Sequence, residues 1–159
     1  MKGRGFTLME LIVVMLLTAI LAAVALPRFF GAGAFADRGF SDQALAALRY
    51  AQKDAVAMRR NVCVNINAAA GTVALSYAAA AGAGQACNGG AVLDPASGTA
   101  FVGKAPGGVG FAASAAIIFD SLGRPVDVNG VPLAAATLIQ VTGDAPQTLT
   151  VEPETGYAH

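Results

Sequence analysis

The stretch GRGFTLMELI at residues 3–12 opens an apolar segment that continues as VVMLLTAILAAVAL to Leu26, directly before Pro27. Residues 6–26 contain one charged side chain, Glu10, and are numerous enough to cross a bilayer as a helix. Two basic residues, Lys2 and Arg4, precede the segment. The positive-inside rule therefore predicts a single pass with the N-terminus in the cytoplasm and the rest of the chain outside.

Two ordinary interpretations of this segment compete with a third. A secretory signal peptide is usually shorter, although LAAVALP at 21–27 resembles a cleavage site. A plain membrane anchor leaves Glu10 unexplained, because a carboxylate at the centre of a bilayer costs about 2.5–3.5 kcal/mol. The third interpretation gives Glu10 a partner, which is a new amino terminus on a neighbouring copy of the helix, created by cleavage after Gly5.

The run GFTLMEL at 5–11, with its apolar continuation and Pro27, resembles the class III signal of type IV pilins and type II secretion pseudopilins. The resemblance implies that a prepilin peptidase cleaves between Gly5 and Phe6 and methylates the new amino group of Phe6. It also implies that Glu10 sets the register against the amino terminus of an adjacent subunit. The implied partners are other pilin or pseudopilin subunits, the peptidase, and the inner membrane with its assembly platform. The head would then be periplasmic, and later part of a periplasmic or extracellular filament.

The rest of the chain predicts an α+β head. Residues 41–60 have the apolar period of an amphipathic helix, with Ser41 as its N-cap and arginines at its end. Residues 28–40, after Pro27, are a weak helix or a flexible joint. Strands are expected at 62–67, 72–77, 100–102, 115–120, 137–142 and 147–152, and Asn129-Gly130 is the best turn signal.

The expected architecture is the pilin fold, in which a long N-terminal membrane-spanning helix packs against a small antiparallel β-sheet head. The predicted order is a leader peptide at 1–5, a transmembrane and assembly helix at 6–26, a helix linking to and packing on the head at 27–60, and the antiparallel β head at 61–159.

Cys63 and Cys87 are the only cysteines, and they follow a membrane-targeting segment. An oxidising compartment favours a disulfide between them, which would tie the Ala- and Gly-rich loop at 78–110 to the sheet. Free buried thiols are the alternative.

The C-terminal third carries a second resemblance, to the GspH/FimT branch of minor pilins and pseudopilins, from which a mannose-sensitive-haemagglutinin-type minor pilin is not separable. The matching residues are Phe119, Gly123, Arg124, Val151, Thr155 and Gly156.

No catalytic, metal or cofactor site is predicted. The single histidine is the last residue, His159, which leaves no Ser-His-Asp or Cys-His set, and the acidic residues lack a calcium-loop spacing. Some FimT-type proteins bind DNA through arginines after the Thr-Gly motif, but here that segment reads GYAH. Residues after 26 carry eight basic and nine acidic side chains, so a structural subunit is favoured over a DNA-uptake pilin, and DNA is not expected as a partner.

Overall fold

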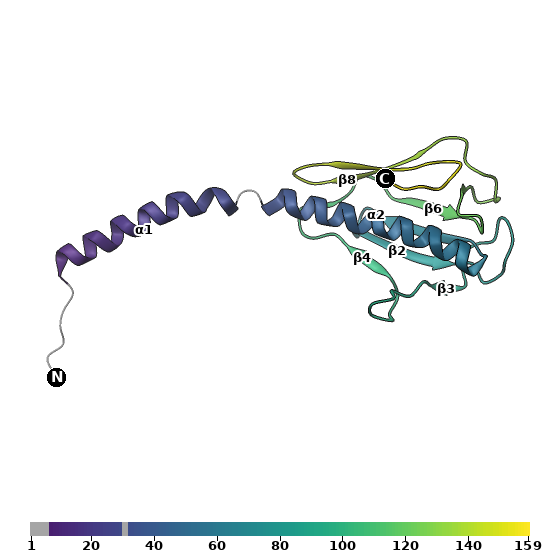
Figure 1. Ribbon diagram of the computed structural model, residues 1–159, viewed down its shortest axis with the longest axis horizontal. Coiled ribbons are helices and arrows are strands. Elements are labelled where there is room, and N and C mark those ends of the chain that lie inside the picture. The colour runs from purple at the N-terminus through teal and green to yellow at the C-terminus, as the bar shows by residue number, and fades with distance from the viewer. Residues whose placement is uncertain (1–6, 30–31) are drawn as a thin grey trace. The chain divides into compact units, whose positions relative to one another are not determined.

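Helix α1 spans Leu8–Phe29 in the computed structural model, which describes residues 7–29 and 32–159. The chain divides between Gly33 and Ala34 into two structural units (Figure 1). The first contains α1 and the first two residues of a second helix, α2, and the second contains the rest of α2 and the described strands.

Helix α2 spans Ala32–Met58, so the predicted N-cap at Ser41 is wrong. Ser41 is buried inside the helix, and its predecessors Asp37 and Phe40 are also buried, at 1% and 3% exposure. Asp37 accepts a hydrogen bond of 2.6 Å from the backbone N–H of Ala145, and the Phe40 ring lies 5.0 Å from that of Phe111. These tertiary contacts outweigh the low helix propensity of the glycine-rich start.

The end of α2 is a Schellman cap without glycine. The N–H of Arg60 donates to the carbonyl of Ala55 and that of Arg59 donates to Val56, while Arg59 adopts a left-handed φ of 53°. The chain then turns directly into the first strand.

Two antiparallel sheets form the rest of the head. The larger has the strand order β3-β2-β1-β6-β7, with β4 also paired to β2, and the smaller has the order β5-β8-β9. The strands of the larger sheet are β1 Val62–Asn67, β2 Thr72–Tyr77, β3 Gly90–Ala91, β4 Val102–Lys104, β6 Ala115–Phe119 and β7 Pro125–Val126. Those of the smaller sheet are β5 Gly110–Phe111, β8 Thr137–Thr142 and β9 Gln147–Val151. The α+β class with an antiparallel sheet is confirmed.

The longer strands match their predicted positions closely. Strands β1, β2 and β8 have the predicted bounds, β6 and β9 each end one residue earlier, and β4 lies at 102–104 instead of 100–102. The two-residue strands β3, β5 and β7 were not predicted, because so short a strand has no period of its own.

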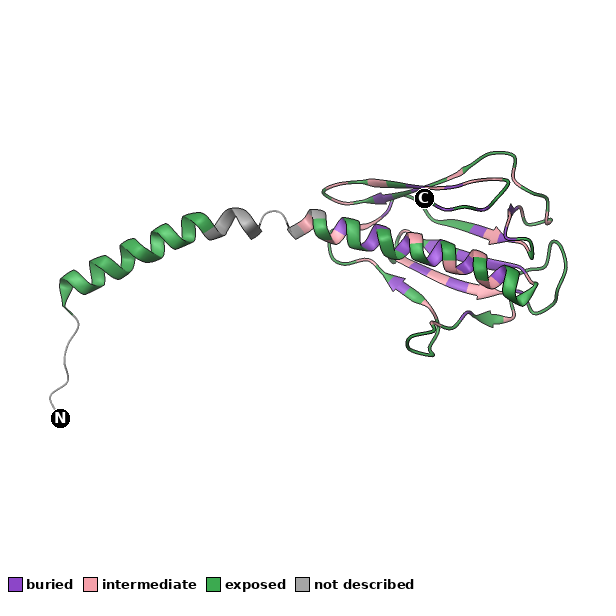
Figure 2. Cartoon of the chain, in the orientation of Figure 1, coloured by how far each residue is buried: buried purple, intermediate pink, exposed green. Residues whose placement is uncertain are grey.

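One hydrophobic core joins α2 to both sheets. Small residues of α2, such as Ala47 and Ala51, are fully buried and let the helix approach the strands closely. Figure 2 shows this buried stripe along α2 and the buried positions on the strands. Strand β1 alternates, with Val62, Val64 and Ile66 in the core. The opposite face of β1 therefore carries Cys63.

Candidate functional site

The N-terminal helix begins with a side-chain cap. The N–H of Glu10 donates to the hydroxyl oxygen of Thr7 at 3.2 Å, and the N–H of Leu11 donates to the Thr7 carbonyl. The spacing Thr7-x-x-Glu10 is the capping-box pattern, a sequence signal that was not used in the prediction. Gly5 and Phe6, the predicted cleavage and methylation residues, lie outside the described residues.

Apart from Glu10 and Thr18, the described side chains of α1, residues 8–24, are apolar. All residues from 7 to 24 are exposed, among them Leu8, Met9 and Leu21 at 68% or more. Thr18 donates its hydroxyl to the Val14 carbonyl at 2.9 Å, so this polar group is satisfied within the helix. The carboxylate of Glu10 is exposed and forms no ion pair with any described residue. A helix that is apolar all round needs another apolar environment.

A membrane span was predicted for residues 6–26. Across the described ranges 7–29 and 32–159, no helix combines the length and the apolarity needed to cross a membrane. The span therefore stays a prediction, and its first residue, Phe6, lies outside these ranges.

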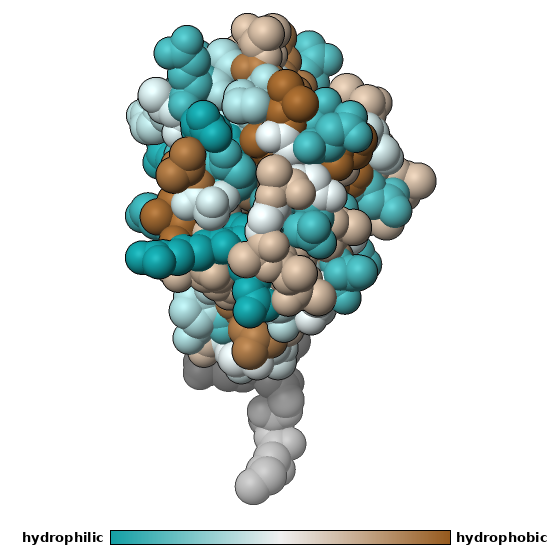
Figure 3. Space-filling model, turned by 90° about the vertical axis from the view of Figure 1, so that its right-hand side faces the viewer, coloured by the Kyte–Doolittle hydropathy of each residue, from teal (hydrophilic) through white to brown (hydrophobic). Residues whose placement is uncertain are grey.

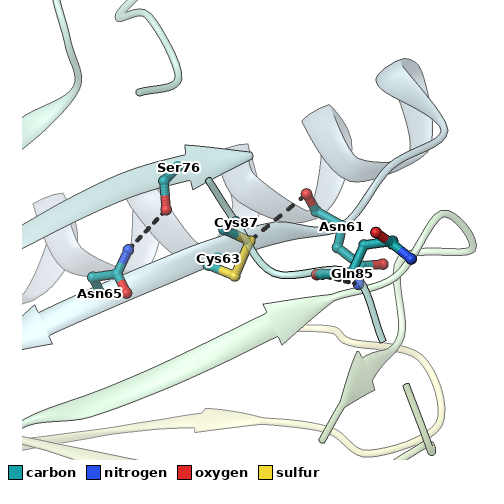
Figure 4. Close-up of a disulfide and its surroundings, with 6 residues drawn as sticks. All are labelled: Asn61, Cys63, Asn65, Ser76, Gln85 and Cys87. Carbon is teal, nitrogen blue, oxygen red and sulfur yellow. Dashed lines mark hydrogen bonds between the residues drawn. A yellow bond between two sulfur atoms is a disulfide. The ribbon is translucent and has the colours of Figure 1, made fainter. Parts of the chain in front are cut away.

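Cys63 and Cys87 form a disulfide, with their Cα atoms 6.1 Å apart (Figure 4). The loop that carries Cys87 is also bound to the start of β1, because the side-chain amide of Asn61 donates to the Gln85 carbonyl at 3.1 Å. The N–H of Gly89 donates to the Tyr77 carbonyl at 2.8 Å. We call residues 79–89 the disulfide loop. These bonds hold it against the face of the larger sheet opposite α2.

Residues of the second resemblance meet on α2. The side-chain amide of Gln52 donates to the carbonyls of Gly123, at 3.1 Å, and Thr155, at 2.6 Å. Gly156 has a φ of 66°, and a Cβ there would collide with the Gly123 carbonyl oxygen. We call Gln52, Gly123, Thr155 and Gly156 the C-terminal clasp. Close backbone approach requires glycine at position 156, and a positive φ of 80° favours glycine at position 123.

The other residues of that resemblance lie in the core or in a turn. Phe119 and Val151 are fully buried in the core. Arg124 forms an ion pair of 2.8 Å with Asp120. Beside the clasp, Arg49 donates to the Ala158 carbonyl at 3.0 Å. The Arg49 and Gln52 hydrogen bonds fasten residues 155 and 158 to α2.

Two turns with the pattern Asp-x-x-Gly follow each other at 120–124 and 127–131. In each, the aspartate accepts hydrogen bonds from two backbone N–H groups, those of Leu122 and Arg124 or those of Asn129 and Val131, at 2.8 to 2.9 Å. Hydrogen bonds from Val131 and Asn129 hold the pKa of Asp127 below its usual value. The second turn contains the predicted Asn129-Gly130 signal.

A groove of about 520 Å³ lies between α2 and the β2–β3 pair. Its walls are Tyr50, Asp54 and Met58 of α2, Tyr77 of β2, and residues 91–93. The Tyr50 hydroxyl donates to the Leu93 carbonyl at 2.8 Å, while the buried Oδ2 of Asp54 has no hydrogen-bond partner among the described residues. We call this the Tyr50–Asp54 groove. No single stretch of sequence contains it, and it was not predicted.

The lining of the Tyr50–Asp54 groove contains one carboxylate, that of Asp54, and no basic side chain. Burial raises the pKa of Asp54. Burial and then the negative charges of Asp54 and Asp94 raise the pKa of Tyr50. Within residues 32–159, no lysine, arginine or histidine nitrogen lies at ion-pairing distance from Asp54 or Asp94.

One end of the head has a surface of mixed character. The end of the head seen in Figure 3 interleaves hydrophobic with hydrophilic side chains. The described part of the chain holds no group of three or more His, Cys, Asp or Glu side chains arranged to bind a metal.

Comparison with known families bears on the N-terminus. Residues 1–26 match the family described as the prokaryotic N-terminal methylation motif. Neither curated proteins nor solved structures gave a match. The motif indicates a membrane-anchored precursor that is a type IV pilin-like substrate of prepilin peptidase and a structural subunit assembling with other pilins. The N-terminal segment of this chain is thus a type IV pilin-type methylation signal.

Proposed function

We propose that this protein is a minor pilin or pseudopilin of the GspH/FimT type, a structural subunit of a type IV pilus or a type II secretion pseudopilus. The observation that carries the proposal is the N-terminal methylation motif at residues 1–26. The C-terminal clasp supports the subtype, because it explains why glycines occupy positions 123 and 156.

In the proposed mechanism, the precursor crosses the inner membrane once, with its N-terminus in the cytoplasm and its head in the periplasm. Prepilin peptidase cleaves between Gly5 and Phe6 and methylates Phe6. The apolar surface of α1 supports the next step, in which the helix leaves lipid for a bundle of similar helices. Glu10 then pairs with the amino group of Phe6 on a neighbouring subunit. A desolvated pair of this kind serves register better than net stability.

Mass spectrometry of the protein extracted from membranes tests the processing step. The mature chain should begin at N-methylated Phe6. An intact Met1, or a chain that begins after Ala25, refutes the proposal.

Replacement of Glu10 tests the register role. Glu10→Leu should leave membrane insertion intact and abolish incorporation into filaments, measured by immunoblotting of sheared filaments. Thr18→Val is the matched control, because it also removes a polar group from α1, and one that is already satisfied within the helix. Normal incorporation of Glu10→Leu would contradict the role given to this carboxylate.

A further inference from the structure

The Tyr50–Asp54 groove has the dimensions and the chemistry of a binding site. Its volume of about 520 Å³ lies within the range of about 300–1,000 Å³ that is typical of ligand sites. Met58 and Leu93 are 40% and 57% exposed, so apolar side chains line its rim and are accessible to a partner.

The unpaired carboxylate defines the charge of the missing partner. Asp54 Oδ2 is buried without a hydrogen-bond partner among the described residues, because the Tyr50 hydroxyl beside this carboxylate donates to the Leu93 carbonyl instead. A buried polar atom is normally satisfied. Asp94 lies outside the groove lining, and its negative charge is near enough to act on the Tyr50 hydroxyl. Because no cation of the described head lies at ion-pairing distance from either acid, a cation from outside is the complementary group.

The apolar walls define the shape of that partner. Tyr50 and Tyr77 contribute aromatic rings to the lining, and rings attract cations through their faces. Met58 and Leu93 suit an aliphatic stem. A charged head on a flexible apolar stem describes the side chain of arginine or lysine.

We propose that the Tyr50–Asp54 groove receives an arginine or lysine side chain from a neighbouring filament subunit, an inference that rests on the assembly function proposed above. Charge complementarity selects this occupant, and the groove then forms a lateral contact between heads. This contact is separate from the packing of α1 helices.

Titration of the full processed chain in detergent micelles tests the chemistry without any filament. The probe is n-butylguanidinium, and n-butanol is the neutral comparison. With methyl-labelled methionine, the Met58 signal should shift on addition of the cation, while those of Met9 and Met15, in α1, serve as internal references.

Asp54→Asn should weaken binding of the cation about tenfold or more, because it removes a charge-assisted contact. Asp42→Asn is the matched control: it removes the same charge from an exposed site on the same helix, and it should leave the affinity unchanged. Equal binding by Asp54→Asn, or an equal shift with n-butanol, overturns the proposal.

A photoreactive residue at position 93 tests the source of the cation. In assembled filaments it should cross-link to a segment of another subunit that carries arginine or lysine. Absence of such an adduct in filaments that contain the chain overturns the subunit as occupant. Failure of the wild-type chain to enter filaments refutes the proposed function instead, whatever the micelle titration gives.

Discussion

The turns at 120–124 and 127–131 have nearly the same backbone and different neighbours. Their glycines, Gly123 and Gly130, have φ values of 80° and 81°. A Cβ at Gly123 would meet side-chain atoms of Val56 and Gln52 at 3.1 and 3.3 Å. At Gly130 it would meet the backbone nitrogen of Gly84 at 2.5 Å, within the disulfide loop.

Gly123 and Gly130 share one reason for being glycine and differ in a second. The φ value is a property of the turn itself and is common to both sites. The surroundings differ, because the first turn faces side chains of α2 that can move, whereas the second faces the backbone of a cross-linked loop. One turn thus anchors the C-terminal clasp, and the other supports the disulfide loop.

Removal of the disulfide should have the largest effect. Cys63→Ser combined with Cys87→Ser should lower the free energy of unfolding by about 3–4 kcal/mol, because the bond closes a loop of 24 residues in the unfolded chain. Urea denaturation of the chain in micelles measures this loss, and reduction of the wild type should reproduce it. A loss below about 1 kcal/mol would show that the second turn holds the loop without the bond.

The next largest effects are the stability losses on substitution of the two glycines, which should differ. Gly130→Ala should lower the free energy of unfolding by about 3 kcal/mol, and Gly123→Ala should lower it by about 1–2 kcal/mol. Both variants strain a positive φ, but only Gly130→Ala adds a backbone collision. Urea denaturation of both variants measures the difference. In the disulfide-free background the cost of Gly130→Ala should fall, since the loop can then move, while that of Gly123→Ala stays the same. Equal costs for the two variants would remove the distinction between the turns.

Loss of the Gln52 side chain from the C-terminal clasp should lower the stability by a smaller amount. Gln52→Ala should cost about 1–2 kcal/mol, since the variant loses both hydrogen bonds from this amide to backbone carbonyls. Gln43→Ala is the matched control, an exposed glutamine on the same helix. Thermal unfolding compares the two variants. Equal melting temperatures would show that the Gln52 hydrogen bonds of the C-terminal clasp do not stabilise the head.

The smallest effect concerns pH. The lowered pKa of Asp127 means that its ionised form stabilises the fold above the ordinary aspartate pKa of about 3.9, and that this contribution is lost as the pH falls through the lowered value. Asp127→Asn should therefore be less stable than the wild type at pH 7, and the gap should close in acid. Denaturation at several pH values measures the gap. Asp144→Asn, at an exposed site, should show no gap at any pH.

Local patterns made most of the fold predictable. The alternation in 62–67 and 137–142 fixes which side chains face the core, so β1 and β8 were found with their bounds. The start of α2 was not found, because Asp37 and Phe40 are held by residues more than 70 positions away in the sequence. Strands of two residues exist only through their partners, so β3, β5 and β7 were missed for the same reason.

The candidate sites divide in the same way. The methylation motif is contiguous, so the signal around Glu10 is visible in sequence. The pairing of Cys63 with Cys87 was predicted from the cysteine count and the compartment, and the structure contains it. The Tyr50–Asp54 groove is lined by residues of α2, β2 and the 91–93 segment, which are far apart in the sequence. The sequence could not predict that Asp54 Oδ2 is buried without a partner among the described residues, because that depends on the packing of these segments.

The buried carboxylate of Asp37 has a mechanical consequence when it is considered together with Gln52. The two residues fasten α2 to the β8–β9 turn and to the clasp, at points about four helical turns apart. A pull along the axis of α2 would strain both fastenings and the core between them at the same time. A pull of this kind loads the contacts between α2 and the strands in shear, so many of them must break together. The head should therefore resist it better than it would resist peeling, in which contacts break one at a time.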